Sequence, residues 1–222
     1  MKDIGQAARW IDRVGFALLM PHAGVAMPTL WEAIRGRAGG HPFKDWGPEG
    51  DLLWEWKDEL PKRRLAFYGS VWMGKPGFIS PAMLPAVMKL WSCPPGLDGF
   101  RTAYREGSLS FDASRLGEAL FARGAMNTYR LRHLTGVKPS TFKRSLVELQ
   151  RKLIIAKCGT DDRDTTWPAS VVDLSARIFP KAHFELRRIS FLEAREETMA
   201  TLKEHAPKLA ERQLFRLLRL SR

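Results

Sequence analysis

The sequence predicts an α+β protein that is mostly helical, with a winged helix-turn-helix core, an N-terminal helix and β-hairpin region, and a C-terminal helical tail. Three observations lead to this fold class. Residues 111–153 show three helical patterns separated by turn residues, residues 153–172 show two β-like runs around a polar loop, and residues 182–222 are strongly helical in composition. A chain of 222 residues can bury roughly 70% of its unfolded surface, in one domain or two closely packed ones.

An amphipathic helix is expected to open the N-terminal α+β region, residues 1–96, which should pack on the rest of the chain. Apolar residues recur at helical spacing over residues 3–18, and this helix should end before Pro21. Thr29 is followed three residues later by Glu32, a pair that predicts a capping box. A short helix should therefore begin at this point.

A helix that leads into a β-hairpin is the richest local signal of the same region. Residues 52–63 favour a helix, residues 64–73 form a strand-like run of large apolar side chains, and the following Gly-Lys-Pro-Gly favours a turn. Ser80 predicts the N-cap of a further helix that continues to Trp91. The Pro- and Gly-rich segment 92–99 then ends that helix and gives the first region boundary.

The winged helix-turn-helix unit is expected within residues 97–180. Asp112 is a good N-cap for the first of its three helices, and Gly124 suits the end of that helix. The side chain of Asn127 can cap a short second helix, which Gly136 ends.

The third helix, residues 140–152, is predicted to begin at Ser140 and to be amphipathic. Its apolar residues share one stripe at helical spacing: Phe142, Leu146, Leu149 and Leu153. The opposite face carries polar and mainly basic residues: Ser140, Lys143, Arg144, Glu148 and Arg151. We expect the apolar stripe to pack on the protein and the basic face to remain open to solvent.

Two β-like runs after this helix, LIIAKC and WPASVV, predict a hairpin whose polar loop is the wing. Asp161, Asp162 and Asp164 outweigh Arg163 in that loop, so the wing tip should be held away from phosphate. The run VVDLSARIF is then expected to be helical.

The C-terminal helices are expected over residues 181–222, with a break near Pro207. The last helix carries leucines on one side and arginines on the other. Such a helix can lie on a membrane surface, but more often it docks on its own protein, and we expect the second arrangement.

Positive charge is concentrated in the predicted core. The formal net charge of the chain is +12. Between Arg101 and Lys157 the sequence has twelve basic and only four acidic residues, so about two thirds of the excess lies in about a quarter of the length. A field this concentrated favours a polyanion as partner, although a basic face can also be merely solvated.

Composition argues against several other classes of protein. The two cysteines, Cys93 and Cys158, and the five histidines show no metal-ligand spacing, so no metal and no cofactor is expected. Phosphate-loop, dinucleotide-binding and Gly-x-Ser-x-Gly motifs are absent from the sequence. The N-terminus lacks the unbroken apolar run of a signal peptide or membrane span. We expect a cytoplasmic protein without a membrane partner, and the sequence leaves its oligomeric state open.

One constellation could carry chemistry. Trp54, Trp56 and Asp58 lie close together in the sequence, with Lys57 between them. Aromatic faces bind cations and stack on bases, and a carboxylate beside them could activate water or stabilise positive charge on a sugar. This makes Trp54 and Trp56 a candidate base pocket and Asp58 a weak catalytic candidate. The alternative is that both tryptophans are core or rim residues and that Asp58 forms ion pairs.

The sequence also resembles a known family. The segments IDRVGFALLMP, MPTLWEAI, WKDELPKRRLAFYG, FISPAMLP, STFKRSLVELQRKLIIAKCG and VVDLSARIFP are similar to AlkZ-like winged-helix DNA-binding proteins, and most closely to the AlkZ-related branch. The best-known members of the AlkZ-like family are bacterial alkylpurine and crosslink DNA glycosylases. The resemblance implies a Gln-x-Gln catalytic pair, but the only glutamines here are Gln6, Gln150 and Gln213, and no such pair exists.

These observations predict a winged-helix protein that binds duplex DNA through its third helix. The residues expected at the interface are Ser140, Thr141, Lys143, Arg144, Arg151 and Lys152. Two alternatives stay open. One is an alkylated-base DNA glycosylase that uses the region from Trp54 to Asp58, and the other is a winged-helix module for contacts with an acidic protein.

Overall fold

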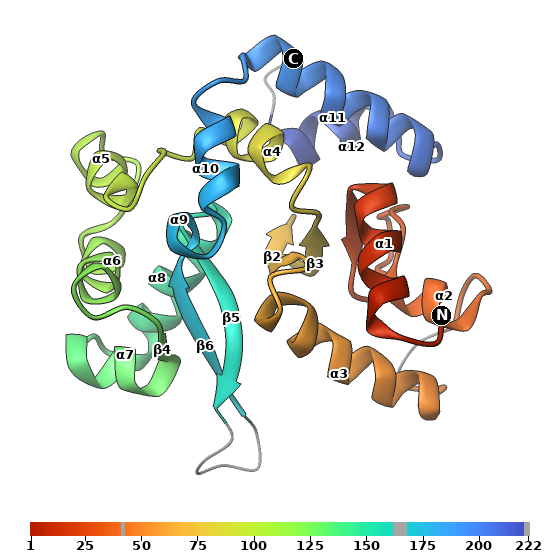
Figure 1. Ribbon diagram of the computed structural model, residues 1–222, viewed down its shortest axis with the longest axis horizontal. Helices are drawn as coiled ribbons and strands as arrows, with labels where there is room; N and C mark the ends of the chain where they lie inside the picture. The colour runs from red at the N-terminus through yellow and green to blue at the C-terminus, as the bar shows by residue number, and fades with distance from the viewer. Residues whose placement is uncertain (41–42, 162–167, 220–222) are drawn as a thin grey trace.

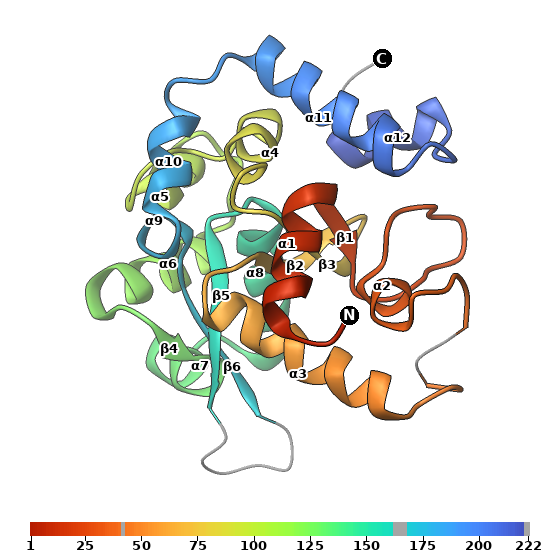
Figure 2. The same ribbon diagram turned by 45° about the vertical axis from the view of Figure 1, so that its right-hand side comes forward.

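The computed structural model describes residues 1–40, 43–161 and 168–219. Within these residues the protein is mostly helical and has two small antiparallel sheets (Figure 1). This confirms the predicted α+β class. One sheet belongs to the N-terminal region and the other to the middle of the chain, and the C-terminal helices lie along one end of the molecule (Figure 2).

The N-terminal region is a three-stranded sheet with helices around it. Its elements are, in order, α1 (Ile4–Val14), β1 (Phe16–Leu18), α2 (Leu30–Arg35), α3 (Pro48–Lys62), β2 (Phe67–Trp72), β3 (Lys75–Ile79) and α4 (Leu84–Leu90). The strand order is β1-β3-β2, and both pairs are antiparallel. A Cβ atom at Gly77 in the central strand would lie 2.5 Å from the carbonyl oxygen of Ala17 and from the Trp72 ring. Only glycine therefore fits this close approach of the strands.

The predicted helix over residues 3–18 is too long. Helix α1 ends at Val14, and Gly15 follows at a φ of 72°, a value that glycine adopts without strain. Phe16 then pairs with Ile79 in the sheet. The hydrogen bonds available from β3 thus outweigh the helical periodicity of the last three residues.

The other N-terminal predictions are closer to the structure. The Thr29 hydroxyl accepts a hydrogen bond from the Glu32 backbone N–H at 3.1 Å, so the predicted N-cap is confirmed. The predicted capping box is only half formed, because the Glu32 carboxylate accepts from the Thr29 hydroxyl at 2.8 Å in place of the Thr29 backbone N–H. The predicted helix and hairpin are also confirmed as α3, β2 and β3. Their turn lies at Met73 and Gly74, and the Lys-Pro-Gly that was expected in the turn belongs to β3.

The middle of the chain contains the helices and hairpin that the sequence predicts, in the predicted order. The elements are α5 (Gly99–Arg105), α6 (Phe111–Arg123), β4 (Met126–Asn127), α7 (Thr128–Thr135), α8 (Pro139–Arg151), β5 (Ile155–Asp161) and β6 (Ala169–Leu174). Helix α5 and strand β4 were not predicted. Strand β4 pairs with β6 and gives the sheet the order β4-β6-β5. The predicted wing loop falls mostly on residues 162–167, outside the described residues.

Two predicted helix starts in this region are wrong. The N-cap of α6 is Ser110, whose hydroxyl accepts from the Ala113 N–H at 3.3 Å, and Asp112 lies in the first turn. Helix α8 begins at Pro139 and not at Ser140, because a proline is well tolerated at the first helical position. The caps of α7 at Asn127 and Gly136 are confirmed.

Four helices follow in the described residues up to 219: α9 (Ser175–Ile178), α10 (Pro180–Leu186), α11 (Phe191–His205) and α12 (Glu211–Leu218). The prediction that VVDLSARIF is helical is wrong for its first half, because Val171 and Val172 pair with β4 and β5 in the sheet. The break near Pro207 is confirmed as the gap between α11 and α12.

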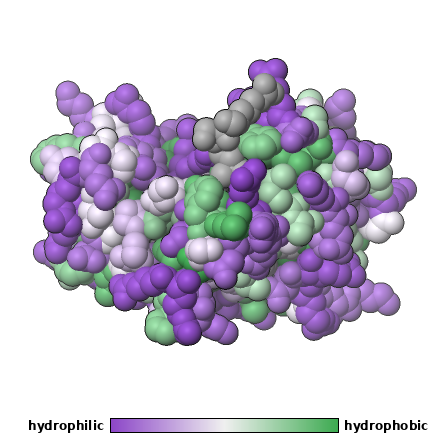
Figure 3. Space-filling view, turned by 90° about the horizontal axis from the view of Figure 1, so that it is seen from above, coloured by the Kyte–Doolittle hydropathy of each residue, from purple (hydrophilic) through white to green (hydrophobic). Residues whose placement is uncertain are grey.

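The buried side chains place the C-terminal helices against the N-terminal region. One apolar cluster lies within α5 to α8 and their sheet, and includes Phe100, Leu116 and Leu149. A larger cluster joins the first sheet and α4 to the C-terminal helices, where Trp91 and Leu218 belong to the same core. Seen toward the C-terminal helices, the surface is largely hydrophilic, with hydrophobic side chains near its middle (Figure 3). Helix α12 is thus held to the body of the protein by its apolar side.

Candidate nucleic-acid interface

Helix α8 buries one side and exposes the other, as its sequence predicts. Phe142 and Leu149 are buried in the core of the middle region, whereas Lys143 and Arg144 are exposed. Leu146, which was also expected on the buried stripe, is only partly buried. The apolar face of α8 is therefore packed against the protein, and its basic face, which we call the open front, is exposed to solvent.

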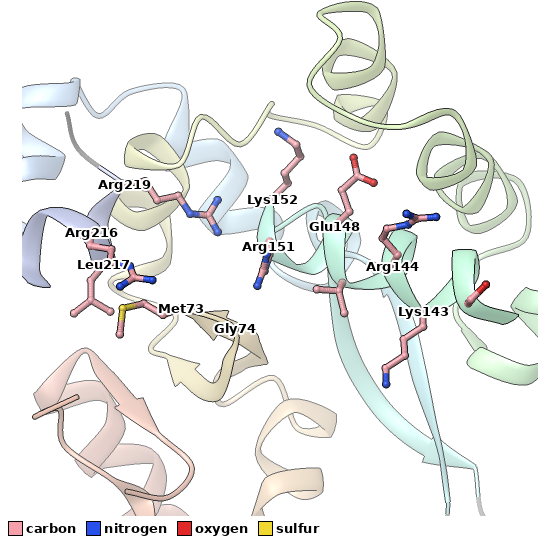
Figure 4. A pocket seen from close by; sticks show the side chains of 12 residues that line it. Met73, Gly74, Lys143, Arg144, Glu148, Arg151, Lys152, Arg216, Leu217 and Arg219 are labelled. Atoms are coloured by element: carbon pink, nitrogen blue, oxygen red, sulfur yellow. The ribbon is translucent and has the colours of Figure 1, made fainter. Parts of the chain in front are cut away.

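The open front of α8 forms one wall of a groove with a volume of about 920 Å³, which we call the basic groove (Figure 4). The turn at Met73 and Gly74 and the C-terminal helix α12 form the rest of its lining. Six basic side chains line it: Lys143, Arg144, Arg151, Lys152, Arg216 and Arg219. Residues from three distant parts of the sequence thus meet at one surface.

The cations of the basic groove have no carboxylate partners in the described part of the chain, although many other basic residues do. Arg101 pairs with Glu118 at 2.6 Å, for example, and Lys62 pairs with Glu59 at 2.6 Å. One acidic residue, Glu148, lines the groove. Its two oxygens accept hydrogen bonds from the backbone N–H and the hydroxyl of Ser110, at 2.7 and 2.6 Å. The lining therefore carries six cations against one carboxylate, a formal net charge of +5.

The structure brings five of the six predicted interface residues together. Ser140, Lys143, Arg144, Arg151 and Lys152 all line the basic groove. The sixth, Thr141, is partly buried on α8 and is not part of the lining.

Two arginines of the groove, Arg216 and Arg219, were not predicted as interface residues. The sequence signal was present, because α12 carries arginines opposite its buried leucines Leu214, Leu217 and Leu218. What the sequence alone does not give is where α12 docks. Helix α12 flanks the basic face of α8 without covering it, since Lys143, Arg144 and Arg151 remain exposed.

The second candidate site contains an ion-pair cluster between α3 and β5. Asp58 pairs with Lys57 at 2.7 Å and also accepts a short hydrogen bond from the Lys157 ammonium. The side chain of Lys157 is only 7% exposed. Burial lowers the pKa of Lys157, and the hydrogen bond with Asp58 opposes this effect. Burial also raises the pKa of the adjacent Tyr68 above its usual value.

The two tryptophans of this candidate site differ in exposure. Trp56 is 2% exposed and belongs to the core formed by α1, α2 and α3. Trp54 is 36% exposed on the other side of α3, where the Lys57 ammonium lies 4.2 Å from the centre of its ring. Asp58 thus sits in an ion-pair network, while Trp56 presents no open ring face.

His183 takes part in a buried network that joins three segments. Its Nδ1 accepts from the Gly96 backbone N–H at 3.2 Å, so its Nε2 carries the proton and donates to the Ser175 hydroxyl at 2.9 Å. Ser175 in turn donates to the Leu153 carbonyl. Burial lowers the pKa of His183 to about 4, so the imidazole is neutral at physiological pH.

Among the described residues, no three His, Cys, Asp or Glu side chains lie close enough to hold a metal ion. In the same part of the chain, every helix is too short or too polar to cross a membrane. Neither the curated proteins nor the solved structures include a match to this sequence. The AlkZ-related family model, in contrast, matches residues 1–219, so the chain belongs to the AlkZ-related family.

Proposed function

We propose that this protein binds duplex DNA through the basic groove, with α8 as the helix that approaches the major groove. The observation that carries the proposal is a set of six cations that line one continuous groove and have no carboxylate partner among the described residues. A duplex carries a regular array of phosphates, and neutralising them releases condensed counterions, which favours binding. Membership of the AlkZ-related family supports a link to DNA repair.

The element order supports the proposed role of α8. Three helices followed by a hairpin are the element order of a winged helix-turn-helix unit, in which α8 would be the recognition helix. Ser140, Lys143 and Arg144, in the first half of α8, would then lie nearest to the bases or their phosphates. Arg151 and Lys152, at its end, would contact the backbone.

A salt titration of duplex binding tests the proposal. The logarithm of the affinity should fall linearly with the logarithm of the salt concentration, with a slope of about 0.9 per phosphate neutralised. Replacing Lys143 and Arg144 by alanine together should weaken binding and flatten this slope by roughly 1–2, because two phosphate contacts are lost.

The matched control is the double variant Lys2→Ala, Arg13→Ala, which removes two exposed charges outside the groove. Its slope should stay close to that of the wild type. If the Lys143 and Arg144 variant keeps the wild-type slope as well, α8 is not the binding surface. Running plain and alkylated duplexes side by side, with an assay for base release, also measures any glycosylase activity.

A further inference from the structure

Helix α12 is fixed firmly enough to present a defined surface. Leu214, Leu217 and Leu218 are buried in the core shared with α4. The Gln213 side chain also donates a hydrogen bond to the Gly24 carbonyl at 2.6 Å, which ties the helix to the N-terminal region. With α12 docked in this orientation, Arg216 and Arg219 line the basic groove.

The guanidinium of Arg219 is held in place by Trp91. Its Cζ atom lies 4.0 Å from the centre of the buried indole, a cation–π contact. Arg219 has a φ of 56°, a left-handed conformation that is strained for a residue other than glycine. Partial burial and, to a smaller extent, the charge of Arg151 lower the pKa of Arg219. The positive charges of Arg151 and Arg219 thus lie near one another, and neither forms a salt bridge with a described carboxylate.

Arg151 reaches the same end of the groove from the opposite wall. A Cβ atom at Gly74 would lie 2.9 Å from its Nη2 atom, so the guanidinium rests against the β2–β3 turn. Figure 4 shows the guanidinium groups of Arg151, Arg216 and Arg219 in the space between α8 and α12. Glu148, the acid of the lining, accepts hydrogen bonds from Ser110 and forms no salt bridge with these three arginines.

We propose that Arg151, Arg216 and Arg219 form a phosphate-binding site at the end of the basic groove, and that in the DNA complex this site holds a backbone phosphate. Each guanidinium offers a planar set of donors that matches two phosphate oxygens. A phosphate among the three groups would also relieve their mutual repulsion. The assignment of the phosphate to DNA rests on the proposed function, whereas the site itself does not.

The site gives α12 a role in orienting the nucleic acid. A phosphate held by α12 on one wall, while Lys143 and Arg144 contact the strand from the other wall, would fix the register of the backbone in the groove. The C-terminal helix would then be part of the interface, in addition to stabilising the core.

The variant Arg216→Gln tests the site, and Arg212→Gln is its matched control. Both arginines are exposed on α12, but only Arg216 lines the groove. In a salt titration of duplex binding, Arg216→Gln should weaken binding and reduce the slope by about 0.9, the value for one phosphate. Arg212→Gln should leave the slope within error of the wild type.

Inorganic phosphate provides a second probe that is independent of DNA. At a tenfold excess over its Kd, and at ionic strength matched with chloride, phosphate should raise the wild-type Tm by about 3–5 °C. Arg216→Gln should lose this rise, and Arg212→Gln should keep it. The Tm of each variant in chloride alone shows whether it is folded.

The outcomes separate the site from the proposed function. If Arg216→Gln behaves like Arg212→Gln with both probes, the site is refuted, even where the Lys143 and Arg144 variant confirms DNA binding. If the phosphate response is lost but the DNA slope is unchanged, the site binds free phosphate and its assignment to DNA is wrong. If the Lys143 and Arg144 variant keeps the wild-type slope, the proposed function fails, and the phosphate response alone decides the site.

Discussion

Glu148 on α8 accepts two hydrogen bonds from Ser110 at the start of α6, one from the backbone N–H at 2.7 Å and one from the hydroxyl at 2.6 Å. The same Ser110 hydroxyl caps α6 by accepting from the Ala113 N–H. The carboxylate therefore locks two helices of the middle region together. Since Glu148 also lines the basic groove, its charge has a structural function at a place where it opposes anion binding.

Glu148→Gln should strengthen DNA binding and weaken the fold. The amide keeps an acceptor for Ser110 but removes a negative charge from the groove, so affinity at low salt should rise up to about fivefold. Loss of the charge-assisted hydrogen bonds should cost about 1 kcal/mol of unfolding free energy. Glu106→Gln, an exposed acid outside the groove, is the control. An equal gain in both variants would mean that only net charge matters.

Gly117→Ala should destabilise the protein although alanine favours helices. A Cβ atom at this position in α6 would lie 2.6 Å from the Phe100 ring, so α5 and α6 would have to separate. Overpacking of this kind costs about 1–3 kcal/mol and the helix-propensity gain is about 1 kcal/mol, so we expect a net loss of stability of about 1 kcal/mol, the middle of this range. Denaturant unfolding measures the difference. In a Phe100→Leu background the same substitution should cost less, and equal costs in both backgrounds would contradict the contact.

Much of the fold follows from local patterns in the sequence. The Thr29, Asn127 and Gly136 caps depend on residues only a few positions away, and the two hairpins on apolar runs around a turn. Strand β4 and the extended start of VVDLSARIF were missed because their conformation depends on pairing with distant strands. Met126, for example, is held by Val172.

The candidate interface was predicted only along one helix. The basic residues of α8 could be found from its amphipathic pattern. The contribution of Gly74, Arg216 and Arg219 could not, because it depends on how the β2–β3 turn and α12 dock against α8. Helical periodicity says which side of α12 is buried, but it does not say which neighbour its exposed side faces.

Stability should fall as the pH drops below about 6.5, because of His183. Its pKa is about 4 in the folded protein and about 6.5 in the unfolded chain, so the unfolded state binds more protons between these values. The contribution of the neutral His183 side chain to the free energy of unfolding is present in full above pH 6.5. It is lost as the pH falls toward 4, at about 1.4 kcal/mol per pH unit. Denaturant unfolding at pH 7.5 and 5.0 should therefore differ by about 2 kcal/mol from this residue alone.

His183→Asn separates this effect from general acid sensitivity. The asparagine oxygen can replace Nδ1 as the acceptor for Gly96, but the side chain does not titrate. The difference in stability between pH 7.5 and 5.0 should shrink by about 2 kcal/mol. His133→Asn, which removes an exposed imidazole from α7, is the matched control. An unchanged difference in the His183 variant would show that its protonation does not control stability.

Asp58→Asn should destabilise the fold by roughly 2 kcal/mol, because it leaves the buried Lys157 ammonium without a carboxylate. Breaking a fully buried pair costs about 3–5 kcal/mol, and the cost here is lower since Asp58 is 21% exposed. Lys157→Met removes the buried charge itself and should restore most of the loss in the double variant. Unfolding of the four proteins of this cycle, together with base release from alkylated duplexes, separates structure from catalysis. A purely structural Asp58 changes only stability, whereas a catalytic one abolishes base release even where Lys157→Met has restored the fold.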